Sequence, residues 1–363
     1  MKVVIDNHIP YIKEAAEWLF DEVSFLPGSA FHDRPEVKEA DALIIRTRTH
    51  CDEALLGNSQ VRFVVTATIG HDHIDTTFMQ HAGIAWTNCQ GCNATSVAQY
   101  VRNAILCLGK KGRLGIVGYG HVGRAIKQAV EAIGCEVMLN DPPLERRETP
   151  SYPPKGGRLT PHAKVLPFRG VRETPFVSLQ EIAEQCDIIS FHTPLTFDGE
   201  FPTFHLADED FFCRLKKKPV IINTARGGVI DELALLHAFD DGLVSQMIID
   251  TWEGEPHIHT ELLQKAFIAT PHIAGYSADG KSNATRMALQ AVCRHFGISI
   301  SDQERFLSLT ASPPLPKELQ PSGDLVKDAL SLYNPLTDSA RLKAAPANFE
   351  ALRNNYPLRR EQF

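Results

Sequence analysis

The sequence lacks a long apolar run and any excess of positive charge. None of its 363 residues belongs to a stretch approaching the ~18 apolar residues that a membrane span needs, and Val3–Ile5 looks like a strand rather than a signal peptide. Asp and Glu (44) outnumber Lys and Arg (37), giving a net charge of -7. No overall field therefore attracts nucleic acid or an anionic membrane. We expect a cytoplasmic protein with neither as a partner.

Cysteine is also sparse. Eight cysteines spread over 363 residues are typical of reduced thiols, not of a disulfide framework. Cys89 and Cys92 form a lone CxxC motif, which elsewhere is half of a zinc site or a redox pair. No second CxxC or suitably spaced histidine pair completes it, so we predict no metal. With 43% hydrophobic and 22% charged residues, the chain has the composition of a globular protein. Its length of 363 residues is typical of two or three domains.

Short apolar runs alternate with helical patterns along most of the chain, which predicts α/β architecture with parallel sheets. The first expected sheet uses Val3–Ile5, Ala42–Ile45, Phe63–Thr66 and Ile84–Trp86. A helix over Thr95–Leu108 leads to a second, doubly wound sheet with six strands. These are expected at Leu114–Val117, Val137–Leu139, Ile188–Phe191, Val220–Ile222, Met247–Ile249 and Phe267–Ala269.

Proline marks two irregular regions. Eight of the 23 prolines lie between Pro142 and Pro175, which predicts a long surface loop. After Ile300 the chain is punctuated by proline, and short helices are expected within Leu325–Leu332 and Phe349–Arg360. This tail is too small for a large core of its own, so we expect it to pack on another part of the protein.

A glycine-rich turn follows the predicted strand Leu114–Val117 and opens the helix Arg124–Ala132. In Gly118-Tyr119-Gly120-His121-Val122-Gly123, glycines allow a tight turn and close approach of the backbone to a pyrophosphate at the helix N-terminus. Asp141 closes the next strand, where a carboxylate accepts hydrogen bonds from a ribose diol and repels a 2′-phosphate. The pattern favours NAD over NADP, although Arg146 and Arg147 nearby could compensate for the phosphate.

Three chemistry-bearing residues follow consecutive strands of the same sheet. The guanidinium of Arg226 can hold a substrate carboxylate and polarise a neighbouring carbonyl, while His272 takes a hydroxyl proton as hydride leaves carbon. Glu255 beside the imidazole would favour its charged form. Each has an ordinary structural alternative, namely a surface ion pair, a helix-start charge or a loop histidine. Their position at neighbouring strand ends beside a nucleotide motif favours catalysis.

The segments Gly118–Gly123, Asn223–Gly227, Asp250–Pro256 and Thr270–Gly275 resemble the D-isomer-specific 2-hydroxyacid dehydrogenase family. The resemblance implies a Rossmann cofactor domain, a smaller flavodoxin-like substrate domain, and oxidation of a 2-hydroxy acid by NAD. It implies Arg226, Glu255 and His272 as the catalytic residues. The cofactor contacts that it implies are Gly118, Gly120, His121, Val122, Gly123, Asp141, Thr193, Thr224, Ala225, Arg226, Asp250 and Gly275.

Asn88–Ala94, Phe191–Leu195 and Ala274–Ser277 are most similar to one subgroup of this family. For this subgroup the implied substrate is a phosphorylated four-carbon 2-hydroxy acid on the route to pyridoxal 5′-phosphate. Thr47, Thr68 and Tyr276 match its substrate contacts. Arg46, directly after a predicted strand, is our candidate for the phosphate, and Arg359 and Arg360 are weaker ones that could equally be solvated charges or reach a neighbouring subunit.

The resemblance also implies how the domains are divided. Residues 1–93 and 277–298 would form the substrate domain, 94–276 the NAD-binding domain, and 299–363 a C-terminal region that joins two copies into a homodimer. Two alternatives stay open. The substrate could be another D-2-hydroxy acid, such as phosphoglycerate, glycerate or lactate, because the catalytic residues do not separate these. The chain could also be a non-enzymatic NAD(H)-sensing binding protein.

Overall fold

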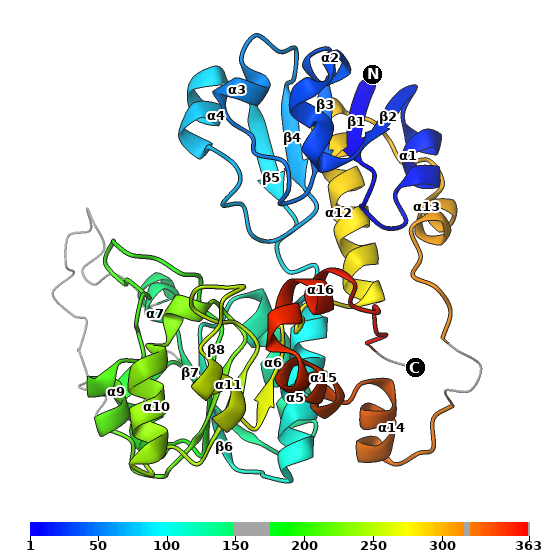
Figure 1. Cartoon of the computed structure of the whole chain (residues 1–363). Helices are drawn as coiled ribbons and strands as arrows, with labels where there is room; N and C mark the ends of the chain where they lie inside the picture. Colours follow the sequence, from blue (N-terminus) through cyan, green and yellow to red (C-terminus); the bar gives the residue numbers. More distant parts are fainter. Residues whose placement is uncertain (149–174, 316–319, 362–363) are drawn as a thin grey trace, which may run out of the picture. The chain divides into compact units, whose positions relative to one another are not determined.

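The computed structural model describes residues 1–148, 175–315 and 320–361. The chain forms two compact units. Unit 1 comprises Met1–Gln99, Gly275–Tyr333 and Pro357–Phe363, and unit 2 comprises Tyr100–Ala274 and Asn334–Tyr356. The helix α5 (Ala94–Leu108, cyan in Figure 1) therefore contributes residues to both units.

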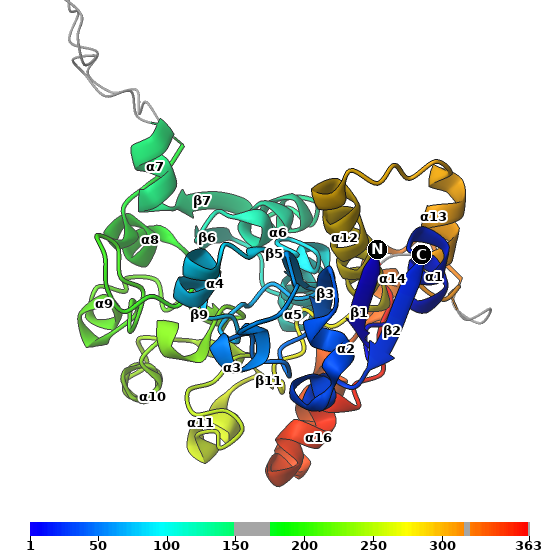
Figure 2. The same ribbon diagram turned by 90° about the horizontal axis from the view of Figure 1, so that it is seen from above.

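Unit 1 contains a five-stranded parallel sheet in the order β2-β1-β3-β4-β5, which is the flavodoxin-like order. Figure 2 shows β1 and β2 side by side at one edge. The strands are β1 (Lys2–Asp6), β2 (Glu22–Leu26), β3 (Ala42–Ile45), β4 (Phe63–Thr66) and β5 (Ala85–Asn88). The helices are α1 (Lys13–Leu19), α2 (Pro35–Lys38), α3 (Glu53–Leu56), α4 (Thr76–Ala82), α12 (Ala278–Phe296), α13 (Gln303–Leu309) and α14 (Leu325–Leu332), with a 3₁₀ turn η1 (Gly28–Asp33).

Both faces of this sheet are buried, which explains why its inner strands are continuous apolar runs. Val3 and Ile5 belong to a core that includes residues of α1 and α12, whereas Val4 lies in a separate core on the other face. Strand β2, which the sequence analysis missed, is an edge strand of mostly half-buried residues and lacks the apolar run that marked its neighbours.

Unit 2 contains the predicted six-stranded parallel sheet, in the order β11-β10-β9-β8-β6-β7. Its strands are β6 (Arg113–Val117), β7 (Glu136–Asn140), β8 (Ile188–Phe191), β9 (Val220–Asn223), β10 (Gln246–Ile249) and β11 (Ile268–Ala269). Its remaining helices are α6 (His121–Glu131), α7 (Pro142–Glu148), α8 (Leu179–Gln185), α9 (Glu209–Cys213), α10 (Glu232–Asp240), α11 (Thr260–Lys265), α15 (Pro335–Ala344) and α16 (Phe349–Asn354), with 3₁₀ turns η2 (Gly227–Val229) and η3 (Pro346–Asn348). The order reverses at β6, between β7 and β8, and ligands of such sheets bind at the carboxyl ends of the strands there.

The expectation of a loop from Pro142 to Pro175 is wrong at its start, because residues 142–148 form α7, drawn next to β7 in Figure 2. Asp141 stabilises this helix by accepting a hydrogen bond from the Leu144 amide (3.0 Å). Pro142 and Pro143 lie in the first turn, where a missing backbone N–H costs nothing. The rest of the predicted loop, 149–174, lies outside the described residues.

The C-terminal tail is divided between the two units instead of forming one of its own. Helix α14 occupies the predicted range Leu325–Leu332 and belongs to unit 1, and α15 and α16 belong to unit 2. Leu342 of α15 and Phe349 of α16 are fully buried in the hydrophobic core of unit 2. Short helices obtain their stability from such packing, because each is too short to be stable alone.

Candidate active site and cofactor site

The three predicted catalytic residues follow three neighbouring strands of unit 2. Arg226 comes after β9, Glu255 after β10 and His272 after β11. The first two loops are in backbone contact, since a Cβ on Gly227 would lie 2.0 Å from the carbonyl oxygen of Trp252. The sheet therefore gathers the arginine, the glutamate and the histidine at one edge, as predicted.

The side chains of Glu255 and His272 are joined by a hydrogen bond. The Nδ1 atom of His272 lies 2.8 Å from Oε2 and 3.1 Å from Oε1 of Glu255. Both side chains are largely buried, with 26% and 18% exposed. Within the part of the chain that the structure describes, Nε2 of His272 has no hydrogen-bond partner. One ring nitrogen is thus held by the carboxylate, and the other is free for a substrate proton.

The carboxylate of Glu255 is held in place by further donors. The Trp252 amide donates to Oε1 (3.0 Å), and Arg353 of α16 donates to Oε2 (3.3 Å). Burial alone would raise the pKa of Glu255, but the contacts with His272, Trp252 and Arg353 outweigh it and keep this pKa below its usual range. Glu255 is therefore negatively charged at neutral pH.

Asp250 shapes the loop that carries His272. Its fully buried carboxylate accepts hydrogen bonds from Thr270 Oγ1 (2.7 Å) and from the amides of Ile273 (2.8 Å) and Ala274 (2.9 Å). These bonds hold His272 in a left-handed conformation (φ 57°), which a non-glycine residue seldom adopts. Burial raises the pKa of Asp250. This supporting role was not part of its predicted function, which was contact with the cofactor.

Arg226 is available for an anion. Its Nη1 donates to the carbonyl of Ala225 (2.8 Å), and its guanidinium makes no ion pair with any carboxylate among the described residues. Backbone φ and ψ at Arg226 are extended, and the 3₁₀ turn η2 begins immediately after it. Arg226 is half-buried, has no carboxylate partner among the described residues, and lies in the loop that contacts the loop of Glu255, so it is suited to bind a substrate carboxylate.

The glycine turn after β6 has the geometry of a nucleotide cradle. Gly118 has φ 95°, and a Cβ there would lie 2.8 Å from the backbone of His192. A Cβ on Gly123 would lie 2.2 Å from the carbonyl oxygen of Gly118, whereas one on Gly120 would meet nothing within 4 Å. Two glycines thus close the turn, and the third leaves open space at the N-terminus of α6, where His121 and Val122 stand in the first turn.

Other predicted cofactor residues surround this turn. Asp141 accepts a hydrogen bond from the Tyr119 amide (2.7 Å) at the end of β7, and a carboxylate with two such bonds still has capacity for a ribose diol. Thr193, after β8, has a buried Oγ1 without a hydrogen-bond partner in the described structure. An unpaired buried hydroxyl at the switch point fits a ligand that supplies the missing partner. Arg146, which could have favoured NADP, forms an ion pair with Glu200 instead.

A half-buried histidine that was not assigned a role supports the predicted contact Thr224. Its Nδ1 is 3.2 Å from Thr224 Oγ1, and its Nε2 is 2.7 Å from Ser190 Oγ. This residue is His192, and burial lowers its pKa to about 3, so it is neutral. Ala225 is buried in the same loop, between Thr224 and Arg226.

In unit 1, the predicted substrate residues lie at the carboxyl edge of the sheet. Arg46 and Thr47 follow β3, and Thr68 follows β4. Arg46 donates to the carbonyl of His8 (2.8 Å) and has its Nε 3.8 Å from the buried carboxylate of Asp6. Residues after β1 and β3 thus meet at the switch point of a 2-1-3-4-5 sheet, the usual ligand position.

Thr68 is oriented by a chain of hydrogen bonds that the sequence did not indicate. Its Oγ1 donates to the carbonyl of Gly70 (3.0 Å) and lies 2.6 Å from Thr66 Oγ1, which lies 3.0 Å from Nε2 of His73. Burial lowers the pKa of His73 to about 4. A neutral, buried histidine therefore supports the hydroxyl through Thr66.

The end of the chain corrects one expectation. Arg359 is only 7% exposed and donates to Gln99 Oε1 (2.9 Å) and to the carbonyl of Tyr276 (2.8 Å). Arg360 pairs with Asp279 (3.0 Å). Both arginines are held within their own unit, so neither is a solvated charge. Gly275 and Tyr276 begin the segment that Arg359 binds, and Lys281 lies over the Tyr276 ring.

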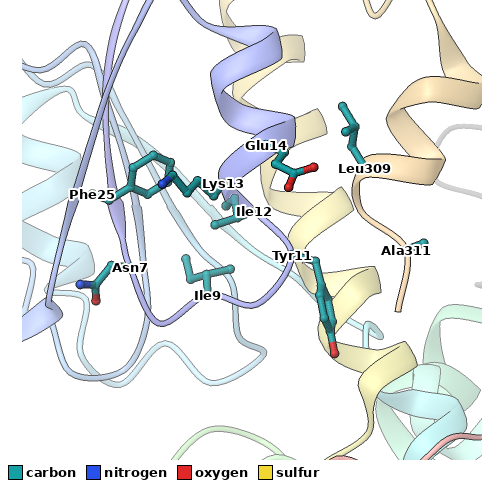
Figure 3. A pocket seen from close by; sticks show the side chains of 9 residues that line it. All are labelled: Asn7, Ile9, Tyr11, Ile12, Lys13, Glu14, Phe25, Leu309 and Ala311. Atoms are coloured by element: carbon teal, nitrogen blue, oxygen red, sulfur yellow. The ribbon is translucent and has the colours of Figure 1, made fainter. Parts of the chain in front are cut away.

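A pocket of about 440 Å³ opens in unit 1 around the β1–α1 loop, β2 and the segment after α13 (Figure 3). Its charged lining residues are Lys13 and Glu14, and no predicted site residue lines it.

Cys89 and Cys92 are buried, and burial raises the pKa of Cys92 to about 11. Within residues 1–148, 175–315 and 320–361, no cluster of His, Cys, Asp or Glu could hold a metal ion and no helix is long and apolar enough to cross a bilayer.

Comparison with known proteins agrees with this architecture. The family model of the D-isomer specific 2-hydroxyacid dehydrogenase, NAD binding domain, matches residues 108–274. A curated erythronate-4-phosphate dehydrogenase of Bacteroides thetaiotaomicron is 48% identical over 100% of this chain and 97% of its own. One from Porphyromonas gingivalis is 38% identical, over 99% of this chain and 94% of its own. The chain belongs to the D-isomer-specific 2-hydroxyacid dehydrogenase family.

Within that family, the sequence is similar over its whole length to erythronate-4-phosphate dehydrogenases. A solved structure of NAD+-bound 3-phosphoglycerate dehydrogenase from Entamoeba histolytica shares the fold, with a TM-score of 0.62 and 24% identity over 83% of this chain and 99% of that one. The protein is thus an NAD-dependent oxidoreductase, and the residues around the glycine turn fit that cofactor.

Proposed function

We propose that the protein oxidises 4-phospho-D-erythronate at its 2-hydroxyl, giving (R)-3-hydroxy-2-oxo-4-phosphooxybutanoate for pyridoxal 5′-phosphate synthesis. The observation that carries the proposal is the Glu255–His272 pair next to the arginine loop, in a chain 48% identical to a curated enzyme of that name. Another D-2-hydroxy acid as substrate is the alternative, because this pair and Arg226 would act on any of them.

In the proposed mechanism, Arg226 binds the substrate carboxylate and orients C2. His272 accepts the proton of the 2-hydroxyl at Nε2, because Nδ1 is already held by Glu255. The negative charge of Glu255 stabilises the imidazolium that forms. Bound NAD would supply the hydride acceptor, so that C2 would lose a hydride as the 2-hydroxyl loses its proton and the 2-oxo acid would form.

We propose that NAD is held by the turn Gly118–Gly123, with its ribose diol on Asp141. Thr193, Thr224, Asp250 and Gly275 complete the proposed cofactor contacts. The unpaired hydroxyl of Thr193 and the open space at Gly120 support this assignment. The proposed substrate contacts are Thr47, Thr68 and Tyr276. Arg46 is proposed to bind the phosphate of the substrate, and the position of Arg46 at the switch point of its sheet supports that role.

A single-turnover assay tests the reaction. Enzyme at high concentration is mixed with NAD and, in turn, 4-phospho-D-erythronate, D-glycerate, D-lactate or D-3-phosphoglycerate, and absorbance of the reduced cofactor is followed. We expect fast reduction with 4-phospho-D-erythronate alone, abolished in His272→Ala and kept in His257→Ala, an exposed histidine of the same unit. Reduction by another acid would change the substrate, and no reduction by any would favour an NAD-sensing protein.

We also propose a cytoplasmic homodimer. Leu325 and Val326 of α14 and Leu336 of α15 are between 37% and 51% exposed, and apolar side chains of this kind are suited to an interface. Eight free thiols fit a reducing compartment. Light scattering after size-exclusion chromatography measures the mass, and a mass near the 40.3 kDa of one chain would contradict the dimer.

A further inference from the structure

One contact of the active site comes from a distant part of the sequence. Nη1 of Arg353, on α16, lies 3.3 Å from Oε2 of Glu255, the oxygen that also accepts from Nδ1 of His272. The carboxylate therefore lies between the imidazole of His272 and a guanidinium supplied by the C-terminal tail. The Arg353 side chain is 33% exposed, so the contact is at the margin of the core.

The tail holds this guanidinium in position through buried contacts. Phe349, four residues earlier and so on the same face of α16, is 1% exposed and packs in the core of unit 2. The preceding helix α15 is fixed as well, because Ser339 Oγ accepts from the Ala269 amide of β11 (3.0 Å). Tyr356, after α16, donates to Asp338 of α15 (3.0 Å). Packed segments before and after Arg353 in the sequence thus hold it in position.

We propose that Arg353 is a positioning residue for catalysis, which acts on His272 through Glu255. It fixes the second lone-pair direction of Oε2, so that the carboxylate holds the imidazole in one orientation. It also competes with the imidazolium for the carboxylate charge, which limits how strongly His272 retains its proton. This inference rests on the proposed roles of Glu255 and His272.

Other titratable groups act on the same site and must be unchanged in the comparison. Asp250 interacts electrostatically with His272, and Glu255 interacts with Glu232, whose carboxylate accepts a hydrogen bond from the amide of Glu253. Asp250, Glu232 and Glu253 are all acidic. Among the described residues, Arg353 is the cation that contacts Glu255 from outside the loops that follow β9, β10 and β11. Its replacement therefore changes one positive charge at the carboxylate and leaves the acidic groups in place.

The test compares Arg353→Gln, Arg353→Lys and Arg341→Gln in the full chain. Arg341 is the matched control, because it lies in the same tail and pairs with Asp338 (3.4 Å), not with Glu255. For Arg353→Gln we expect kcat to fall roughly tenfold to a hundredfold, with the KM for substrate and the affinity for NAD nearly unchanged. Arg353→Lys keeps the charge and should recover most of the loss.

The pH profile provides a readout that a purely structural role would not move. Removal of a cation beside the carboxylate favours the imidazolium form of His272. The pH at which kcat falls on the acid side of the profile (the acid limb) should therefore be higher in Arg353→Gln by roughly half a pH unit to one unit. Arg353→Lys and Arg341→Gln should keep the original limb. An unchanged limb and kcat in Arg353→Gln, or equal losses in Arg341→Gln, would overturn the inference. If His272→Ala is itself fully active, the proposed function fails instead.

Discussion

Glu232 is a buried carboxylate that contacts the loop after β10. It lies in the first turn of α10 and accepts a hydrogen bond from the Glu253 amide (2.8 Å). Burial raises its pKa from 4.5 to about 7, and the charges of Glu253, Glu255 and Asp231 add to this effect against the Glu253 hydrogen bond. At neutral pH the folded protein therefore keeps part of this group protonated.

The pKa of Glu232 predicts a loss of stability with rising pH. The folded state binds the proton more tightly than the unfolded state, so the stabilisation is complete below about pH 4.5 and is lost as the pH passes about 7. The loss in the free energy of unfolding is about 3 kcal/mol. Glu232→Gln, which keeps the acceptor oxygen, should match the parent at pH 5 and be more stable at pH 8.

Urea unfolding at the two pH values measures this difference. Glu209→Gln is the control, because that side chain is 78% exposed and lies on neighbouring helix α9. The prediction is refuted if Glu232→Gln and Glu209→Gln shift stability equally at both pH values.

Residue positions differ in how far the sequence could predict them. The placement of Arg226, Glu255 and His272 after neighbouring strands could be predicted, because adjacent parallel strands end at the same edge. Arg353 was not, because 98 residues separate it from Glu255 and only the burial of Phe349 brings it there. His192 and His73 were missed as supports for the same reason: their partners are set by packing.

At the scale of elements, the glycine turn allows a sharp contrast between two substitutions. Gly118→Ala is expected to destabilise unit 2, because the residue has φ 95° and its Cβ would lie 2.8 Å from His192 backbone atoms. Gly120→Ala should leave stability nearly unchanged, since nothing lies within 4 Å of its Cβ. It should nevertheless weaken NAD binding about tenfold or more by filling the cradle.

Thermal unfolding and calorimetric NAD titration separate the two effects. An NAD affinity for Gly120→Ala equal to that of the parent would show that the pyrophosphate does not approach this turn. A fully stable Gly118→Ala would contradict the backbone geometry.

Elements with a clear apolar period were predictable, and those fixed by local hydrogen bonds or edge positions were not. The inner strands of unit 2, such as β8 and β9, were found because all their residues are buried and most are apolar. The edge strand β7 was found because Val137, Met138 and Leu139 still form an apolar run, although the strand is only partly buried. The sequence pattern failed at α7, where Asp141 supplies the N-terminal hydrogen bond and two prolines fit the first turn. It also failed at β2, an edge strand without a buried apolar run.

At the scale of the whole molecule, Arg359 and Glu361, which are distant in sequence from most of unit 1, are buried in that unit. Arg359 donates to Gln99, to Ser96 and to the carbonyl of Tyr276. Arg359→Met would leave these buried acceptors unsatisfied, so we expect a loss of about 2–3 kcal/mol in stability. Arg294→Met, at an exposed position of α12, should have little effect. Chemical denaturation compares the two, and equal stabilities would refute the prediction.

The division of the tail also constrains how the protein is made. The chain passes between the units at 99–100, 274–275, 333–334 and 356–357, so neither unit is a continuous stretch. During synthesis, the sheet of unit 2 is complete once β11 has emerged, but Leu342, Phe349 and Arg353 follow some 70 to 85 residues later. Arg359 comes later still. Neither unit can therefore finish folding on the ribosome until almost the whole tail has been translated, and a nascent chain stopped before residue 334 would expose the unfinished surfaces of both to chaperones.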